Sequence, residues 1–330
     1  MERLADWDTL DTALAGTAAV CAVACALPGA FLMLRRQSMM ADALSHTALP
    51  GVVFAFLFAH QLHAGGWIGD DAYPTTQWAL LFAGAVGCGV LTAWLTEAVR
   101  RLGRVEAGAA LGVVYTSLFA LGLLVLRKYA DAVHIEPDCV LFGEVEQAVL
   151  NVAFTLPLPG GGALDVPVPF VSGAAVAVAA AVLIRLFWKE LLVSTFDPGL
   201  AAAVGVNPRR VNDALMAATA VILVTVFQSV GSILAIAMLV IPAAAARCCT
   251  DRLGPLLGLA AGIAAVSAFL GYALSVAAVP ALAAAIGLPD VPDAGAAGPT
   301  AFTAGMIFIG CALLGPAQGL LVRRWRARSE

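Results

Sequence analysis

The chain contains nine apolar segments of roughly twenty residues each, and this pattern limits the possible folds more than any short motif does. The segments cover 10–34, 40–59, 75–97, 106–126, 168–189, 211–229, 232–247, 256–279 and 301–322. A helix needs about 20 apolar residues to cross the hydrocarbon core of a membrane. Only 12% of the residues are charged, against about 25% in soluble domains. We therefore predict an all-α polytopic membrane protein with about nine transmembrane helices.

The distribution of positive charge predicts the orientation of these helices. With the N-terminus outside, 15 of the 18 lysines and arginines fall in inside loops or in the C-terminal tail, and only Arg3, Arg127 and Lys128 fall outside. Positively charged loops stay on the cytoplasmic side, so the N-terminus is expected outside and the C-terminus inside. Most carboxylates then lie outside, where they could concentrate cations or simply keep the loops soluble.

The whole chain, 1–330, is predicted to form one transmembrane permease domain. Its longest external loop is expected at about 127–167, with a short interfacial helix over 137–150 and a surface excursion over the Pro- and Gly-rich segment 156–169. A second external segment, 287–300, is expected to be irregular. Glycines spaced four residues apart predict close helix packing, at Gly108, Gly112, Gly254, Gly258 and Gly262.

The second apolar segment carries two ionisable residues, Asp42 and His46, four residues apart. On a helix this spacing places both side chains on one face. Ionisable groups inside a membrane are costly and usually line a pathway, although a buried polar pair between helices is the simpler alternative. Carboxylate and imidazole together suit Mn, Fe and Zn. We therefore expect Asp42 and His46 to line a metal pathway, beside a helix distorted by Pro50, which could expose a carbonyl ligand.

Four further residues are weaker candidates for a metal entrance or a gate. His60 and His63 lie three residues apart at the outer end of the same segment. Gln228 and Ser232 lie where two segments meet on the outside, and helix-to-helix hydrogen bonding would explain them equally well.

The chain carries no nucleotide-binding loop of its own. A P-loop needs a lysine directly after glycine, and neither lysine of this chain, Lys128 or Lys189, follows one. A transporter built on this chain is therefore a gradient-driven carrier or the membrane subunit of a separate ATPase. The inside segment 194–210 favours the ATPase-driven class: Asp197 as N-cap and Pro198 at the first helical position predict a short helix that stops at Gly205.

Four blocks of the sequence resemble the permease family of bacterial ABC importers for manganese, zinc and iron. They are LRRQSMMADALSHTALPGVVFAF at 34–56, EAGAALGVVYTSLFALGLLVL at 106–126, FDPGLAAAVGV at 196–206 and QSVGSILAIAMLVIPAAAARCCTDRL at 228–253, with a shorter match at 139–146. The resemblance implies the fold of a type II ABC importer permease, a multi-pass protein of the bacterial inner membrane. It also implies that Asp42 and His46 belong to the metal pathway. A cytoplasmic coupling helix at about 197–205 would contact the ATPase through Asp197, Pro198, Ala201 and Gly205.

The same resemblance implies the partners. They are cytoplasmic ATPase subunits, a second permease copy or a sibling permease, and an extracytoplasmic metal-binding protein. No permanently bound cofactor, no enzyme activity in this chain and no nucleic-acid partner is expected. A gradient-driven metal carrier remains the alternative, and a permease for bulky iron chelates or cobalamin fits the ligand-bearing segment less well. An intramembrane metalloprotease would need a run such as H-E-x-x-H, which the sequence lacks.

Overall fold

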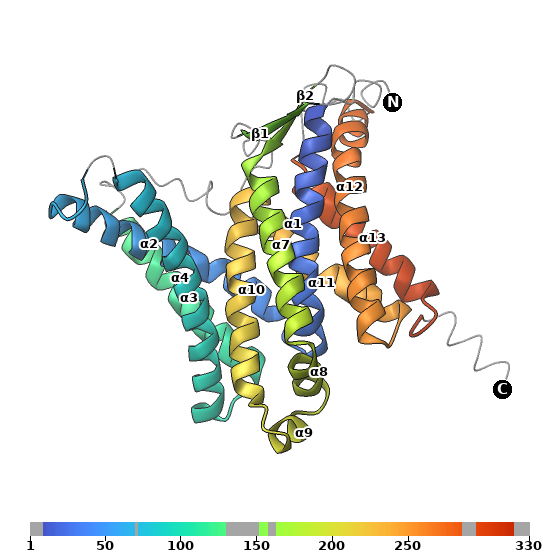
Figure 1. The fold of residues 1–330 in the computed structure, drawn as a ribbon, viewed down its shortest axis with the longest axis horizontal. Coiled ribbons are helices and arrows are strands. Elements are labelled where there is room, and N and C mark those ends of the chain that lie inside the picture. The colour runs from blue at the N-terminus through green and yellow to red at the C-terminus, as the bar shows by residue number, and fades with distance from the viewer. Residues whose placement is uncertain (1–8, 70–71, 130–151, 158–162, 286–294, 320–330) are drawn as a thin grey trace. The chain divides into compact units, whose positions relative to one another are not determined.

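A computed structural model describes residues 9–69, 72–129, 152–157, 163–285 and 295–319 of the chain. Within these residues, nine helices are long and apolar enough to cross a membrane (Figure 1). They are α1 (Thr9–Leu34), α2 (Met39–Ala64), α3 (Tyr73–Gly103), α4 (Ala107–Tyr129), α7 (Val168–Leu186), α10 (Pro208–Val230), α11 (Ser232–Cys249), α12 (Leu253–Ala285) and α13 (Ala297–Leu314). The predicted helical membrane architecture is confirmed. The N-out orientation stays a prediction.

The helices form two compact units. The first contains α1, α7 and α11–α13, and the second contains α2–α4, most of the short helix α8 (Trp188–Phe196), the short helix α9 (Pro198–Ala203) and α10 up to Val224. This division by contacts does not test whether residues 1–330 fold as a single domain, so that remains a prediction.

Helix α1 is the centre of the first unit, where it packs against α7, α11 and α12, while α13 packs against α11 and α12. Its small side chains, such as Ala18, Cys21 and Ala22, are fully buried. A helix lined with small residues lets its neighbours approach closely. At Gly29 the approach is closest, because the backbone of Leu239 on α11 occupies the place that a Cβ atom would need.

The first unit also contains two strands that the sequence analysis did not predict. Strand β1 (Val152–Pro157) pairs antiparallel with β2 (Ala163–Pro167), with Thr155 opposite Asp165. The hairpin contacts α1 and α7. Apolar and β-branched residues flank a glycine-rich connection, which is the ordinary signal for a hairpin. The segment 156–169, expected as a surface excursion, thus contains the end of β1, all of β2 and the first residues of α7, while 158–162 lie outside the described residues.

Helix α2 is the centre of the second unit and packs against both α3 and α4. A Cβ atom on Gly51 would lie 2.8 Å from the Cα atom of Ala85 on α3, and one on Gly122 of α4 would lie 2.6 Å from the Cβ atom of Pro50. These glycines allow the close packing. The glycines at which the sequence predicted close packing do not lie at such close contacts. A Cβ atom would meet nothing within 4 Å at Gly108, Gly112, Gly254, Gly258 or Gly262.

Several predicted boundaries need correction. The ninth segment, predicted at 301–322, is a helix over Ala297–Leu314, because Gly315 and Pro316 end it. The irregular segment expected at 287–300 therefore includes the first turn of α13, and its residues up to 294 lie outside the described residues. The helix expected over 137–150 also lies outside them. Helix α8, which follows α7 directly, was missed.

Candidate metal pathway

Asp42 and His46 lie in the first two turns of α2 and approach each other. The Nε2 atom of His46 is 3.5 Å from the Oδ1 atom of Asp42, and the two side chains are 40% and 51% exposed respectively. The i,i+4 spacing thus brings the two groups together as predicted. Because neither side chain is buried, both can reach an ion beside the helix, and their donor atoms are not consumed by packing.

The pair is level with the middle of the two neighbouring helices. The imidazole of His46 stacks on Tyr115 of α4, with ring centroids 6.0 Å apart, and meets the edge of Phe119 at 5.6 Å. Both aromatic residues lie near the centre of α4, which runs from Ala107 to Tyr129. His46 therefore lies well away from either end of this helix.

Contacts between α2 and α3 also place the Asp42–His46 pair near the middle of the neighbouring helix. A Cβ atom on Gly89 would lie 3.3 Å from the Cδ2 atom of Leu44, which sits between Asp42 and His46 in the sequence. Gly89 comes 16 residues after Tyr73 and 14 before Gly103, the ends of α3. At 1.5 Å per residue, this is about 24 Å from the first end and about 21 Å from the second. Transporter sites commonly lie at this depth, near the bilayer midplane.

Pro50 adds a possible third donor. It lies inside α2, which continues as a helix to Ala64, so the expected distortion does not interrupt the helix. Proline has no N–H group, and the carbonyl four residues earlier loses its helical hydrogen bond. In α2 that carbonyl belongs to His46. Packing of Pro50 against Gly122 of α4 holds the proline in this position.

These donors make an incomplete metal site. Among the described residues, no group of three or more His, Cys, Asp or Glu side chains is arranged to hold a metal ion. The Ser45 hydroxyl is already used, since it donates to the Asp42 carbonyl at 2.6 Å. Asp42, His46 and one carbonyl could hold a divalent cation weakly, with the rest of its ligands supplied by water or by another chain.

The two outer histidines are not part of this site. His60 and His63 follow His46 on α2 by 14 and 17 residues, which is about 21–26 Å along the helix. His60 is exposed. The Nδ1 atom of His63 lies 3.2 Å from the Ile68 carbonyl oxygen, and its ring lies 4.3 Å from that of Tyr73. His63 therefore helps to hold the turn between α2 and α3.

Gln228 and Ser232 flank the junction of α10 and α11, in the first unit. Only Gly231 separates the two helices, and its φ of 81° and ψ of 166° suit glycine alone. Ser232 is the first residue of α11. The neighbouring Ser229 hydroxyl is 3% exposed and donates to the Thr225 carbonyl at 3.3 Å, so it is engaged within its own helix.

The predicted capped helix of the 194–210 segment is present as α9. Asp197 accepts a hydrogen bond from the Leu200 N–H at 2.9 Å, and Pro198 is the first helical residue. Gly205 follows with a φ of 85°, which explains why a glycine stands there. A hollow of about 560 Å³ lies beside the helix, lined by Pro198, Ala202, Gly205, Val206, Asn207, Pro208 and Arg209.

Of the four residues that the resemblance implied as ATPase contacts, Asp197, Pro198 and Gly205 are exposed and Ala201 is not. Ala201 is fully buried, so it can support α9 but cannot meet a partner directly. Phe196, Leu200 and Val204 are instead 58%, 51% and 61% exposed. Exposed large apolar side chains can mark a protein interface when they form one patch.

Sequence reasoning missed Tyr115 and Phe119 as neighbours of the metal pair. They lie four residues apart in the segment 106–126, and that spacing alone placed both rings on one helix face. Nothing in the spacing, however, indicated that this face meets α2.

Comparison with known proteins places the chain in a family. The model of the family described as "ABC 3 transport family" matches residues 6–153 and 168–288. The chain belongs to the ABC 3 transport family. The resemblance drawn from the sequence blocks is thereby confirmed, and the protein is a membrane permease of the metal-transport type.

Within the ABC 3 family, the chain is 38% identical to the manganese transport system membrane protein MntD of Bacillus subtilis (strain 168), over 78% of this chain and 80% of that protein. It is 37% identical to the zinc transport system membrane protein TroD of Treponema pallidum (strain Nichols), over 68% of this chain and 56% of that protein. The structure of PsaBC from Streptococcus pneumoniae in complex with Fab matches with a TM-score of 0.68 and 25% identity, over 100% of this chain and 98% of that one.

Proposed function

We propose that this ABC 3 family permease is the membrane subunit of an ATP-driven importer that moves a divalent transition-metal cation into the cytoplasm of a bacterium. Manganese, zinc and iron are the candidate cations. The observation that carries the proposal is the Asp42–His46 pair, exposed and level with the middle of α3 and α4. Ionisable groups at that level of a membrane are costly and usually line a pathway.

The weakness of the site suits transport. An ion must bind well enough to enter a pathway and loosely enough to leave it. One carboxylate, one imidazole and one freed carbonyl would meet that requirement better than a closed tetrahedral site, which holds zinc as a structural ion. Oxygen and nitrogen donors serve Mn, Fe and Zn alike. A second permease copy, or a sibling permease, would supply the facing half of the pathway.

The driving force is proposed to come from separate ATPase subunits that bind α9. The exposed Leu200 of α9, the exposed Phe196 and Val204 on either side of the helix, and the adjoining hollow are suited to a protein partner. The packing of the second unit also offers a route for the motion. Helix α10 follows α9 directly, and a Cβ atom on Gly89 of α3 would lie 3.0 Å from Ala220 of α10 and 3.3 Å from Leu44 of α2. Movement of α9 would thus reach the helix that carries Asp42 and His46.

Import would then proceed as a switch of access. An extracytoplasmic binding protein would deliver the cation to the outer side, where His60 and His63 are proposed to assist its entrance and Gln228 and Ser232 to gate it. The cation would rest at Asp42 and His46 until ATP binding, transmitted through α9, opened the path inward. The permease itself makes and breaks no covalent bond, and it would reside in the inner membrane.

Reconstitution distinguishes this proposal from a gradient-driven carrier. The purified permease is placed in liposomes alone, with its ATPase, or with an ATPase variant unable to hydrolyse ATP, and manganese and zinc uptake are measured. We expect ATP-dependent uptake only with the active ATPase. Uptake by the permease alone, driven by an imposed proton or sodium gradient, would show that the carrier alternative is correct.

A further inference from the structure

Helices α3 and α10 bring their charged ends together within the second unit. Ala85 and Val224 belong to one buried cluster, and a Cβ atom on Gly89 would lie 3.0 Å from the Cβ atom of Ala220. From the first contact to the second, the residue number rises by four on α3 and falls by four on α10. The two helices are therefore antiparallel. Arg101 lies 12 residues beyond Gly89, and Arg209 lies 11 residues before Ala220. Both arginines are therefore about 17 Å from this contact, at the same end.

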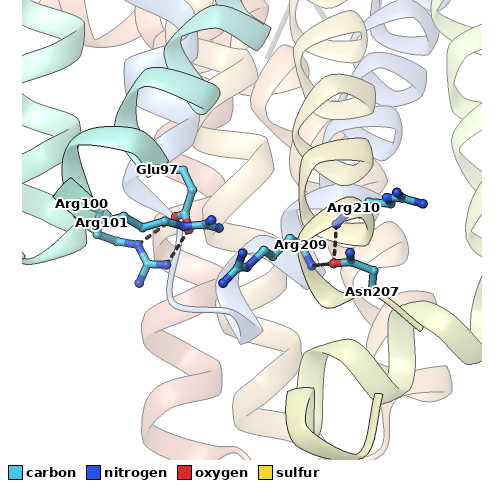
Figure 2. Close-up of polar contacts among 6 residues, drawn as sticks. All are labelled: Glu97, Arg100, Arg101, Asn207, Arg209 and Arg210. Carbon is cyan, nitrogen blue, oxygen red and sulfur yellow. Dashed lines mark hydrogen bonds and ion pairs between the residues drawn. The ribbon is translucent and has the colours of Figure 1, made fainter. Parts of the chain in front are cut away.

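Positive charge exceeds negative charge at this end. Glu97 accepts two hydrogen bonds from Arg100, both at 2.8 Å, and one from Arg101. The Arg209 guanidinium points toward this group, whereas Arg210 points to the opposite side (Figure 2). No ion pair of Arg209 occurs among the residues that the structure describes. Two guanidinium groups thus bind the Glu97 carboxylate, and the third, that of Arg209, points toward them without an ion pair of its own among the described residues.

The backbone holds Arg209 in this place. The Asn207 side-chain oxygen accepts hydrogen bonds from the N–H groups of Arg209 and Arg210, at 3.1 and 3.5 Å, and so caps the start of α10. Pro208 is the first residue of the helix. The first turns of α10 carry one negative charge, that of Asp213, which lies one turn beyond Arg209.

An exposed apolar stripe leads to the same arginines. Val90, Trp94, Glu97 and Arg101 follow one another at intervals of three or four residues, so they lie on one face of α3. Val90 is 40% exposed and Trp94 is 64% exposed, while the Arg101 side chain is 40% exposed. The surface passes within three turns from apolar to aromatic and then to the ion-paired Glu97 and Arg101. Tryptophan is typical of the boundary between lipid chains and headgroups.

We propose that this surface binds an anionic phospholipid of the cytoplasmic leaflet, with its phosphate between Arg101 and Arg209 and its acyl chains along Trp94 and Val90. Guanidinium groups bind phosphate through paired, charge-assisted hydrogen bonds. A single negative phosphodiester with a neutral headgroup substituent would offset one of the two excess positive charges. An acidic segment of a soluble partner would match the arginines but not the apolar stripe below them, so the stripe favours a lipid.

The test uses the full-length permease, purified in detergent. Binding of phosphatidylglycerol and of phosphatidylcholine with identical acyl chains is measured by native mass spectrometry over a range of lipid concentrations. The test variants are Arg101→Gln, Arg209→Gln and the double variant. The matched control is Arg210→Gln, which removes the same charge from the same turn of α10 but on the side facing away. Thermal unfolding of each variant verifies that it is folded.

We expect the wild type to prefer phosphatidylglycerol. The preference for phosphatidylglycerol over phosphatidylcholine should fall about fivefold for each arginine removed and about 25-fold for both. These factors follow because each basic residue near an anionic headgroup contributes about 1 kcal/mol. Arg210→Gln should retain it, and added salt should weaken it in the wild type. Unchanged preference in the double variant would overturn the proposal. Loss of ATPase binding by that variant, with lipid binding intact, would overturn it too and assign the arginines to the protein partner.

Discussion

Replacing His46 with alanine separates metal binding from helix packing. The imidazole has two roles in the structure: its Nε2 atom faces Asp42 at 3.5 Å, and its ring contacts Tyr115 and Phe119 of α4. A loss of transport in this variant alone would therefore be ambiguous. Phe119→Leu is the matched control, because it removes the edge contact with the ring and leaves both proposed ligands in place.

The two roles predict different magnitudes. Aromatic pairs contribute about 0.5–1.5 kcal/mol each, and the 40% exposure of His46 places the loss near the lower end. His46→Ala should thus lower the free energy of unfolding by about 1–2 kcal/mol, and Phe119→Leu by a similar amount. Loss of a hydrogen-bonding partner of a metal ligand typically weakens binding 10–100-fold. Loss of the ligand itself should exceed that, so we expect manganese uptake by His46→Ala to fall at least about 100-fold at limiting metal.

The assay is ATP-dependent uptake of manganese by liposomes that contain the permease with its ATPase, at several metal concentrations. Copurification of the ATPase verifies that each variant assembles. Phe119→Leu should transport within about threefold of the wild type, since its stability loss leaves the protein folded. Equal losses in the two variants would show that His46 acts through packing. Normal uptake by His46→Ala would remove it from the pathway.

Two further outcomes follow from the same structure. Gly51→Ala should destabilise the protein by about 1–3 kcal/mol, because the new Cβ atom would lie 2.8 Å from the Cα atom of Ala85. The control is Gly87→Ala, whose new Cβ atom would meet nothing within 4 Å. This control should leave the melting temperature unchanged or raise it. Gly205→Ala meets no neighbour within 4 Å, but its φ of 85° should cost about 1–2 kcal/mol of local strain and lower transport per ATP hydrolysed; unchanged coupling would argue against α9 as the docking helix.

The sequence predicted the elements governed by local rules. Apolar length placed nine helices, since a membrane-spanning helix must satisfy its backbone hydrogen bonds within itself. The Asp42–His46 contact followed from the i,i+4 spacing, and the start of α9 followed from Asp197 and Pro198, which act within one turn. Each of these features depends on residues close together in the chain.

The features that were missed depend on contacts between distant segments. The glycines at which helices come closest, such as Gly51 and Gly122, are chosen by the partner helix and not by their spacing along their own. The same applies to Tyr115, whose stacking on His46 joins α4 to α2. The exposure of Leu200 and the burial of Ala201 on α9 likewise reflect what lies beneath that helix.

Manganese bound to the purified permease can report its own ligands. Electron spin-echo envelope modulation of Mn²⁺ detects a directly coordinated nitrogen, and it can be recorded for the wild type, His46→Gln and His63→Gln. We predict a nitrogen coupling in the wild type that persists in His63→Gln and disappears in His46→Gln. A coupling that survives in His46→Gln, or one that is absent from the wild type, would contradict a pathway built on Asp42 and His46.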